Sequence, residues 1–349
     1  MENGLTYDPN NSEGLPVTRI ETISDRSINY KRVGYAKDDG KLSKYKMEPG
    51  DILFSHINSL KHIGKTAYYD GEHPLYHGMN LLLLRTTNEE SARFLFYQLN
   101  TSRFLHRCQV LANQAVNQAS INTRELKGIT LHKPSIKEQI KIADFISLLD
   151  NRIATQIKII EKLESLIKGL YERLFNIDGA AYIQLGNVAK IQKGQQINGE
   201  ELSEIGSYYV MNGGVVPSGY LEDFNTLANT ISISEGGNSC GYVQYNGVPF
   251  WSGGHCYTLI EPINSFNYKY LFHYLKFKEQ SIMALRIGSG LPNIQKKDLE
   301  RFPILNVSKE EQDKMACIFD DILDRIICER QIALKYEEQK KYLLSNLFI

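Results

Sequence analysis

The sequence predicts two α/β (mixed α+β) domains in tandem, joined and spaced by two long antiparallel coiled-coil helices, in a chain of 349 residues. Three observations lead to this prediction. The chain repeats itself in one register over much of its length, which indicates two copies of one unit. Residues 136–175 and 309–348 contain no Pro and show helical periodicity throughout. Before each of these stretches, short β-branched and aromatic runs alternate with Gly, Asn and Asp, as in mixed globular domains.

The internal repeat is clearest where the two copies align without a gap. Ser120–Leu126 matches Asn293–Leu299, which lies 173 residues further along. The same offset aligns the ends of the two helical stretches, Phe175 and Phe348. Further upstream the offset becomes 176 residues. We therefore expect a pseudo-twofold molecule built from two similar units.

The predicted boundaries follow from this alignment. The first globule covers residues 1–135, the first long helix 136–177, the second globule 181–306 and the second long helix 307–349. Strands are expected at residues 51–55, 81–85, 230–234 and 255–260, and one amphipathic helix in each globule at 91–110 and 268–285.

Both long helices carry a heptad seam of apolar residues. In the first helix Gln156 is the one polar member of the seam, and the same register places Glu329 at the equivalent position of the second. The predicted seam consists of Ile146, Leu149, Ile153, Gln156, Ile160, Leu163, Ile167, Leu170, Phe319, Ile322, Ile326, Glu329, Tyr336 and Leu343. A lone helix about 60 Å long would leave this seam in water. The two helices are therefore expected to pair with each other.

The two polar seam residues allow two interpretations. In a fully overlapped antiparallel pair, Gln156 and Glu329 would share the central layer, where a hydrogen bond between them would fix the register. Alternatively, both side chains face solvent at a local irregularity of the seam. Their burial distinguishes the two.

Composition excludes several classes of protein. Lys plus Arg and Asp plus Glu both number 40, so the chain is not a polybasic binder. Five Cys residues without a CxxC pair form neither a zinc ribbon nor a disulfide framework, which favours a reducing cytoplasm. The polar start and the short apolar runs predict neither a signal peptide nor a membrane span.

The sequence contains no motif that supports catalysis. It has no Asn/Asp-Pro-Pro-aromatic tetrad for amino-group methylation and no G-x-G-x-x-G. Gly64-Lys65-Thr66 lacks the earlier Gly of a phosphate loop. Pro74 prevents His73 and His77 from sharing a helical face, so they do not form a metal site. We expect no catalytic, cofactor-binding or metal-binding residues in this chain.

Several short motifs occur in order and partly in duplicate. Pro134–Gln139 precedes the first long helix and Val307–Gln312 precedes the second. The remaining motifs are Leu185–Gly194, Gly50–Leu53 and Gly14–Arg19. Together they resemble the specificity subunits of type I restriction–modification systems, over essentially the whole chain. Each motif is weak alone, and the resemblance rests on their order and duplication.

This resemblance implies a non-catalytic, DNA-reading adaptor. In that family each globule is a target recognition domain that reads one half of a split sequence in double-stranded DNA. The helices set the spacer and dock two methyltransferase subunits, and restriction subunits add the translocase and nuclease. The resemblance places S-adenosylmethionine, ATP and Mg on these partner subunits. Two similar globules on a rod also suit duplex DNA, a polymer with two sites at a fixed separation.

The charge of the globules bears on how tightly the chain binds DNA. Residues 1–135 carry 17 basic and 14 acidic side chains, and residues 181–305 carry 9 and 10. Because phosphate contacts dominate affinity for DNA, we expect weak binding by the chain alone and tight binding by the complex. The alternative function is a scaffold that bridges two partner subunits without DNA, which the near-zero net charge favours slightly.

The candidate base-reading residues are polar side chains of loops, with chemistry that suits base edges. In the first globule they are His56, Asn58, Lys61 and Lys65, with Arg85 behind them. In the second they are Asn212, Asn238, Ser239 and His255, with Arg286 and Asn293. For each, an ordinary turn or solvated role is the competing interpretation.

The two globules differ at their start. The second opens with Leu185–Gly194, whereas the residues before Gly14, the match for Gly206, do not resemble that opening segment. We therefore expect the first globule to lack it, and to be less stable or completed by another chain.

Overall fold

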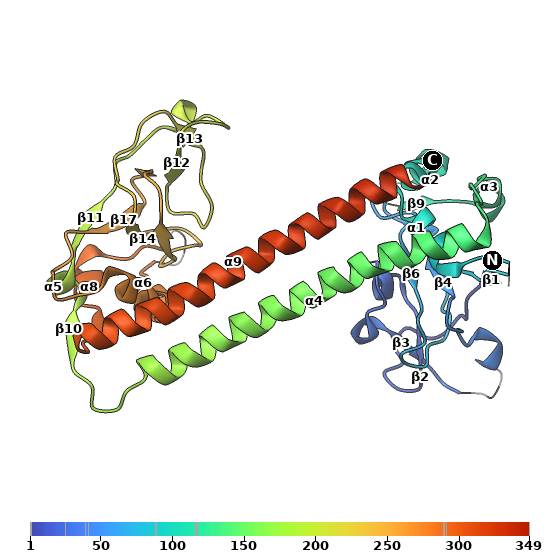
Figure 1. The fold of residues 1–349 in the computed structure, drawn as a ribbon, viewed down its shortest axis with the longest axis horizontal. Coiled ribbons are helices and arrows are strands. Elements are labelled where there is room, and N and C mark those ends of the chain that lie inside the picture. The colour runs from blue at the N-terminus through green and yellow to red at the C-terminus, as the bar shows by residue number, and fades with distance from the viewer. Residues whose placement is uncertain are drawn as a thin grey trace. The chain divides into compact units, whose positions relative to one another are not determined.

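The structure is a computed structural model that describes the chain except residues 1, 25, 39, 41, 88, 116, 117, 289, 291 and 349. The chain forms two compact units: unit 1 is Met1–Ile157 with Gln331–Ile349, and unit 2 is Lys158–Arg330. The long helices are α4 (Ile136–Phe175) and α9 (Lys309–Asn346), and each contributes one end to each unit. Both chain termini belong to unit 1 (Figure 1).

The central sheet of unit 1 is buried on both faces. Its order is β1-β7-β4-β6, all antiparallel, with β1 Glu2–Asn3, β4 Ile52–Phe54, β6 Thr66–Tyr68 and β7 Leu82–Leu84. Successive residues of a strand face opposite sides. Ile52 and Phe54 therefore enter one apolar cluster with Phe104, and Leu53 enters a second with Leu75. Burial on both sides explains the uninterrupted apolar sequences of β4 and β7.

The central sheet of unit 2 repeats this arrangement strand by strand. Its order is β11-β17-β14-β15, again antiparallel, with β11 Lys190–Lys193, β14 Thr230–Ser234, β15 Val243–Asn246 and β17 Cys256–Ile260. The strands expected at residues 51–55, 81–85, 230–234 and 255–260 are β4, β7, β14 and β17. The predicted internal repeat is confirmed.

Smaller elements surround the two sheets. Unit 1 adds β2 Leu15–Val17, β3 Gly34–Ala36, β5 Ile57–Asn58, β8 Asn113–Ala115, β9 Gln118–Ser120 and α3 Thr123–Lys127. Unit 2 adds β12 Tyr208–Met211, β13 Tyr220–Leu221, β16 Trp251–Ser252 and α8 Lys296–Glu300. Short 3-10 helices cover Ile20–Ile23, Tyr30–Arg32, Leu42–Tyr45 and Gly199–Glu201.

Each predicted amphipathic helix is in fact two helices. In unit 1, α1 Ala92–Leu99 is followed by α2 Ser102–Leu111, and in unit 2, α6 Tyr268–Phe277 is followed by α7 Glu279–Met283. The break in unit 1 comes from Thr101, whose hydroxyl accepts a hydrogen bond from the N–H of Phe104 (3.3 Å) and so begins a new helix. Hydrophobic periodicity continues across such a cap, so the sequence pattern predicted one helix where the structure has two.

The opening segment differs between the units. In unit 2, β10 Tyr182–Gln184 pairs with β18 Pro303–Leu305, and α5 Leu185–Val188 follows. In unit 1, β1 pairs with β7 as β11 pairs with β17, so the last part of the segment has a counterpart. Thr130–His132 of unit 1 align with β18 of unit 2. Among the described residues no strand pairs with them, whereas β18 pairs with β10. The difference between the copies therefore lies at β10 and α5.

Both long helices begin with the same capping contacts. The Ser135 N–H and hydroxyl donate to one carboxylate oxygen of Glu138 (3.1 and 2.7 Å). Ser308 and Glu311 repeat these contacts (3.1 and 2.6 Å). Hydrogen bonds from the serine lower the pKa of both glutamates. The Ser-x-x-Glu pattern of the sequence is thus a capping box.

The Gln that follows each capping box ties its helix to the globule. Gln139 and Gln312 are 2% and 1% exposed. Their Oε1 atoms accept hydrogen bonds from the N–H groups of Ser91 (3.0 Å) and Asn267 (2.7 Å), which precede α1 and α6. Their Nε2 atoms donate to the carbonyl oxygen five residues earlier, at 2.9 Å in both units. We call this pair of contacts the glutamine clamp.

Within each unit the long helices run antiparallel. In unit 1, Asp150 of α4 binds Lys340 of α9. In unit 2, Glu164 binds Arg330 (2.5 Å), and the ring of Tyr171 lies 4.6 Å from that of Phe319. Residue numbers rise along one helix as they fall along the other, which confirms the predicted antiparallel pairing.

All predicted seam residues are buried or half-buried. Gln156 is 9% exposed and Glu329 2%, so the alternative in which both face solvent is wrong. Their mutual hydrogen bond stays a prediction. At the end of α9, which ends at Asn346, Leu347 is exposed and Phe348 is buried, as is its repeat counterpart Phe175.

Aromatic anchors hold the helices to the globules. Phe175, which is fully buried, packs against Tyr270 and Tyr274 of α6 with ring centroids 5.7 and 5.3 Å apart. Its repeat counterpart Phe348 packs against Phe94 of α1 at 5.0 Å. The same position of the repeat therefore anchors each globule to a long helix.

Polar contacts reinforce the anchor in unit 2. His273 of α6 is fully buried between the Tyr171 hydroxyl (2.8 Å) and the Asp320 carboxylate (2.9 Å). Burial is the largest influence on this imidazole and lowers the pKa of His273.

Three further findings concern the described part of the chain. All five Cys residues are free thiols. No cluster of His, Cys, Asp and Glu in these residues could hold a metal ion. No helix among them is long and apolar enough to cross a membrane.

Candidate nucleic-acid interface

Four of the five candidates in unit 1 gather where β4 ends. His56 follows this strand, and its carbonyl oxygen accepts a hydrogen bond from the N–H of Ile121 (2.9 Å). Its Nδ1 is buried and has no hydrogen-bond partner in the described part of the chain. Burial, followed by the charge of His77, lowers the pKa of His56. The buried Nδ1 of this imidazole can therefore make one more hydrogen bond.

Asn58, Lys61 and Lys65 lie at the same end of β4, in β5 and in the loop that leads to β6. The Asn58 side chain donates to the hydroxyl of Ser55 (3.1 Å). Lys65 donates to the carbonyl oxygen of Ser24 (2.6 Å), a contact within the globule. Lys61 is exposed. Of the three, Lys61 is therefore the most accessible to a ligand.

Arg85 lies at the opposite end of β4 from His56. It follows β7, whose last residue pairs with Ile52 at the start of β4. Its guanidinium donates two hydrogen bonds to the carboxylate of Asp51 (2.7 and 2.8 Å), which is 1% exposed. A buried carboxylate requires such a cation. The structure thus gives Arg85 a structural contact and does not place it behind the other candidates, as the sequence analysis expected.

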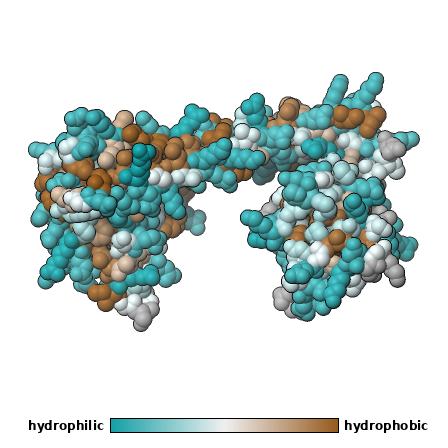
Figure 2. All heavy atoms as spheres, turned by 90° about the horizontal axis from the view of Figure 1, so that it is seen from below, coloured by the Kyte–Doolittle hydropathy of each residue, from teal (hydrophilic) through white to brown (hydrophobic). Residues whose placement is uncertain are grey.

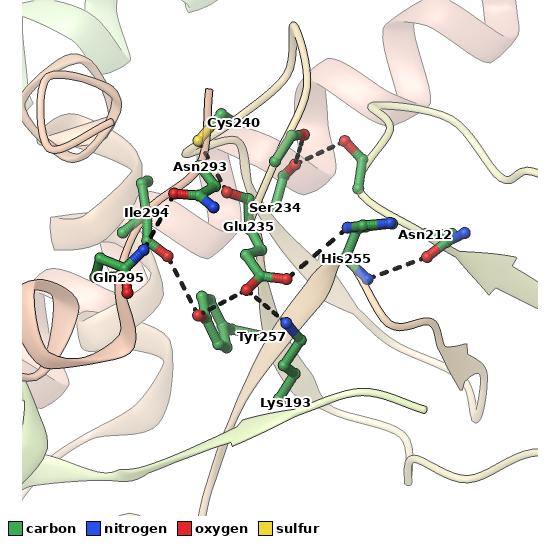
Figure 3. A network of polar contacts seen from close by, with 12 residues as sticks. Lys193, Asn212, Ser234, Glu235, Cys240, His255, Tyr257, Asn293, Ile294 and Gln295 are labelled. Atoms are coloured by element: carbon green, nitrogen blue, oxygen red, sulfur yellow. Dashed lines mark hydrogen bonds and ion pairs between the residues drawn. The ribbon is translucent and has the colours of Figure 1, made fainter. Parts of the chain in front are cut away.

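In unit 2 the candidates converge around the end of β14. Asn293 pairs through its backbone with the residue after Glu235 and with the residue after Arg286. The Asn212 Oδ1 accepts a hydrogen bond from the N–H of His255 (3.1 Å). Figure 3 shows these segments around the Glu235 side chain.

Glu235 is the centre of a polar network and is 8% exposed. One carboxylate oxygen accepts hydrogen bonds from Lys193 Nζ (2.7 Å) and the Tyr257 hydroxyl (3.0 Å). The other lies 4.0 Å from His255 Nδ1 and has no hydrogen-bond partner among the described residues (Figure 3). Burial, followed by the hydrogen bond with Glu235, raises the pKa of Tyr257. We call these four residues the Glu235 network.

Strand pairing assembles the Glu235 network. Lys193 of β11 lies opposite Tyr257 of β17, and Tyr257 lies opposite Ile233 of β14. Asn238 and Ser239 occupy the turn after β14, where Asn238 is exposed and Ser239 half-buried. Neither takes part in the hydrogen bonds of the network.

Sequence analysis did not single out Lys193, Glu235 or Tyr257 as site residues. Lys193 belongs to the opening segment, and Glu235 precedes a glycine pair that is typical of a turn. One signal was available: no Lys or Arg occurs between Lys193 and Lys269. Lys193 is therefore one of few cations that can serve the loops of unit 2.

The interface offers hydrogen-bond donors and no activated nucleophile among these residues. Burial raises the pKa of the Cys256 thiol to about 11, so it stays protonated and unreactive at neutral pH. Lys193, Asn212 and Arg286 present N–H donors instead. Such a set suits the acceptor atoms of nucleic-acid bases.

A family model described as "Type I restriction modification DNA specificity domain" matches the chain twice, at residues 4–165 and 178–337. The chain belongs to the specificity subunits of type I restriction–modification systems. The two matches fall on the two copies of the repeat.

Known specificity subunits resemble this chain over nearly its whole length. It is 31% identical to the "Putative type I restriction enzyme MjaX specificity subunit" of Methanocaldococcus jannaschii, over 99% of this chain and 89% of that one. The crystal structure of the S subunit from M. genitalium has a TM-score of 0.68 at 20% identity and covers 100% of this chain and 93% of that one. A structure that addresses complex assembly and conformational transition of the type I system has a TM-score of 0.55 at 16% identity, with 98% and 94% covered. These two likenesses show a shared fold.

The comparisons confirm the predicted family, the mixed α/β fold with long paired helices, and the assignment as a non-catalytic specificity subunit. Both copies match a DNA specificity domain, so the alternative of a scaffold without DNA is not supported. The domain boundaries and the base-reading residues stay predictions.

Proposed function

We propose that this specificity subunit reads a bipartite target in double-stranded DNA, one half with each unit, within a complex that includes methyltransferase and restriction subunits. One observation carries the proposal. Both units present the same four-stranded sheet, with loops at the same end of the central strand, and those loops carry different side chains. Two copies of one scaffold with different loop chemistry suit two different half-sites.

The long helices support the docking of partner subunits. Phe145 and Leu148 of α4 are 48% and 61% exposed in unit 1, and Ile318 and Ile327 of α9 are 45% and 53% exposed in unit 2. Brown, hydrophobic residues interrupt the teal surface of the helices (Figure 2). Phe145 and Leu148 are three residues apart and share one face of α4, and apolar side chains that are exposed together mark protein interfaces. We assign S-adenosylmethionine, ATP and Mg to the docked partners, and the assembled complex to the cytoplasm.

The charge of the two globules suggests that affinity for DNA and sequence preference come from different subunits. Few phosphate-neutralising side chains are available, above all in residues 181–305. Because counterion release supplies most of the affinity for DNA, the partner subunits would have to contribute phosphate contacts. The specificity subunit would then supply the sequence preference.

Co-purification with a methyltransferase subunit tests this proposal. Binding of randomised duplexes is measured for the chain alone and for the complex over a range of salt concentrations, and methylated adenines are mapped on a plasmid. The complex should bind tightly and select a split sequence, whereas the chain alone should bind weakly and lose affinity with salt. Salt-resistant, sequence-specific binding by the chain alone would contradict this separate origin of affinity and sequence preference. A complex without sequence preference would contradict the proposed function.

A further inference from the structure

Glu235 of unit 2 and His56 of unit 1 occupy the same place in the repeat. Each residue follows the central strand of its sheet. The carbonyl oxygen of each accepts a 2.9 Å hydrogen bond from an isoleucine N–H, and these residues, Ile121 and Ile294, are aligned by the repeat. In both units the hydroxyl of the preceding serine also lies near the carbonyl oxygen two residues further on, at 3.5 and 3.3 Å, although the shortest hydrogen bond of Ser234 is to the Gly213 carbonyl oxygen (2.6 Å). The backbone is the same, and the side chain changes from imidazole to carboxylate.

Each of these two side chains keeps a buried polar atom without a hydrogen-bond partner among the described residues: Nδ1 of His56 and one carboxylate oxygen of Glu235. A buried polar atom without a partner is unfavourable by about 1–3 kcal/mol. A fold that needed only a stable turn would not place one at the same position twice. The position is therefore better explained by function than by folding.

Glu235 holds the ammonium group of Lys193 in a fixed place. Nζ lies 2.7 Å from the carboxylate, while the Lys193 side chain is 53% exposed and that of Glu235 is 11% exposed. An ammonium has three N–H donors, of which Glu235 takes one. Lys193 thus presents oriented N–H donors at the surface.

The charge of the network favours a neutral ligand atom over a phosphate. Glu235 cancels the charge of Lys193, and the long stretch between Lys193 and Lys269 contains acidic residues and no Lys or Arg. Phosphate binding requires positive charge, and a phosphate at Lys193 would meet little net positive charge. Base edges are neutral, and guanine presents two adjacent acceptors, N7 and O6, in the major groove.

We propose that Lys193, positioned by Glu235, reads a guanine in the half-site of unit 2 through the free N–H donors of its ammonium group. This inference rests on the proposed function. His56 takes the place of Glu235 in unit 1, so the same contact would be absent from the other half-site. Lys193 is the contacting residue, and Glu235 is a positioning residue that acts through it.

The experiment uses the purified complex of this chain with its methyltransferase partner. Duplexes in which each target position carries all four bases in turn are compared for binding by wild type, K193Q, K190Q and E235Q. Lys190 is the matched control, because it lies on the same strand and its ion pair is with Glu261 (3.3 Å), outside the network. Thermal unfolding of each variant shows that the fold is retained.

Wild type should prefer guanine at one position of one half-site by about tenfold or more. K193Q should reduce that preference by about tenfold and leave the other half-site unchanged. E235Q should reduce the same preference by a smaller factor, since its amide holds the ammonium less tightly, and K190Q should match wild type.

Three results would overturn the inference alone while wild type remains selective. The first is an equal loss of binding by K193Q on all duplexes, which a phosphate contact would give. The second is a base preference in K193Q that matches wild type. The third is a loss of base preference in K190Q as large as that in K193Q. If wild type itself selects no sequence, the proposed function fails and this inference fails with it.

Discussion

The glutamine clamp in unit 2 gives the sharpest prediction about stability. Replacement of Gln312 by Ala removes an amide that accepts from the Asn267 N–H at 2.7 Å and donates to the Val307 carbonyl at 2.9 Å. Gln312 is 1% exposed. Each backbone group left without a partner destabilises the fold by about 1–3 kcal/mol. Asn267 is half-buried and regains part of this from water, so we expect a loss of about 2–4 kcal/mol for Q312A.

The chain contains its own reporter and its own control for this test. Trp251, the one Trp of the sequence, lies in β16 of unit 2, so its fluorescence follows the unfolding of that unit in urea. The expected loss moves the midpoint by roughly 0.7 M or more at a typical slope of roughly 1–3 kcal/mol per molar urea. Q139A removes the same clamp from unit 1 and should move the Trp251 transition less.

The pH dependence of Q312E adds a second readout. A glutamate at this position can accept from the Asn267 N–H, but when ionised it cannot donate to the Val307 carbonyl, and its charge is buried. Its folded-state pKa should therefore lie above the unfolded value of about 4.3. Stability relative to wild type should then be lowest at neutral pH and recover as the pH falls through the folded pKa. A shift below about 0.5 kcal/mol for Q312A, or an equal shift for Q139A, would refute the reasoning.

Three further predictions concern contacts between the globules and the long helices. F175A should lower the stability of unit 2 by about 3–5 kcal/mol, measured in the Trp251 transition. F348A, at the counterpart position of unit 1, should affect that transition less. Equal shifts would contradict separate anchors. Burial lowers the pKa of His273 below the unfolded value of about 6.5. Wild type should therefore lose stability as the pH falls through about 6.5, and H273Q should lose less. Parallel curves of stability against pH would count against this. Y97F deletes the hydrogen bond to Asp150 (2.7 Å) and should destabilise unit 1 by about 1 kcal/mol, measured by hydrogen exchange of α1, with no change expected in α6.

Most of the fold was predictable because the same sequence patterns occur in both copies of the repeat. The strands β4 and β7 are buried on both faces and appear in the sequence as uninterrupted apolar runs, whereas β14 and β17 appear as short runs of β-branched, aromatic and small residues. The long helices were visible because a seam with one polar break recurs at the same register. The division into α1 and α2 was not predictable from periodicity, since the cap at Thr101 interrupts the backbone but not the apolar pattern.

The candidate site was less predictable, because residues distant in the sequence form it. Lys193, Glu235 and Tyr257 meet through the pairing of three strands, and no local motif records that pairing. Arg85 looked like a base-reading cation by residue type. Its partner Asp51 is a buried carboxylate across the sheet, and only the register between β4 and β7 shows that the two meet. Residue chemistry therefore pointed to loops that the structure brings together in unit 2, but it could not give the contacts between them.

The central claim is that two reading units act on one duplex at a set separation. The most direct measurement is the affinity of the complex for its mapped target with one base pair added to the spacer. One base pair moves the half-sites by about 3.4 Å and rotates them by roughly 35°. Binding should fall to the level of duplexes that carry a single half-site. Unchanged affinity across spacers of several lengths would contradict it.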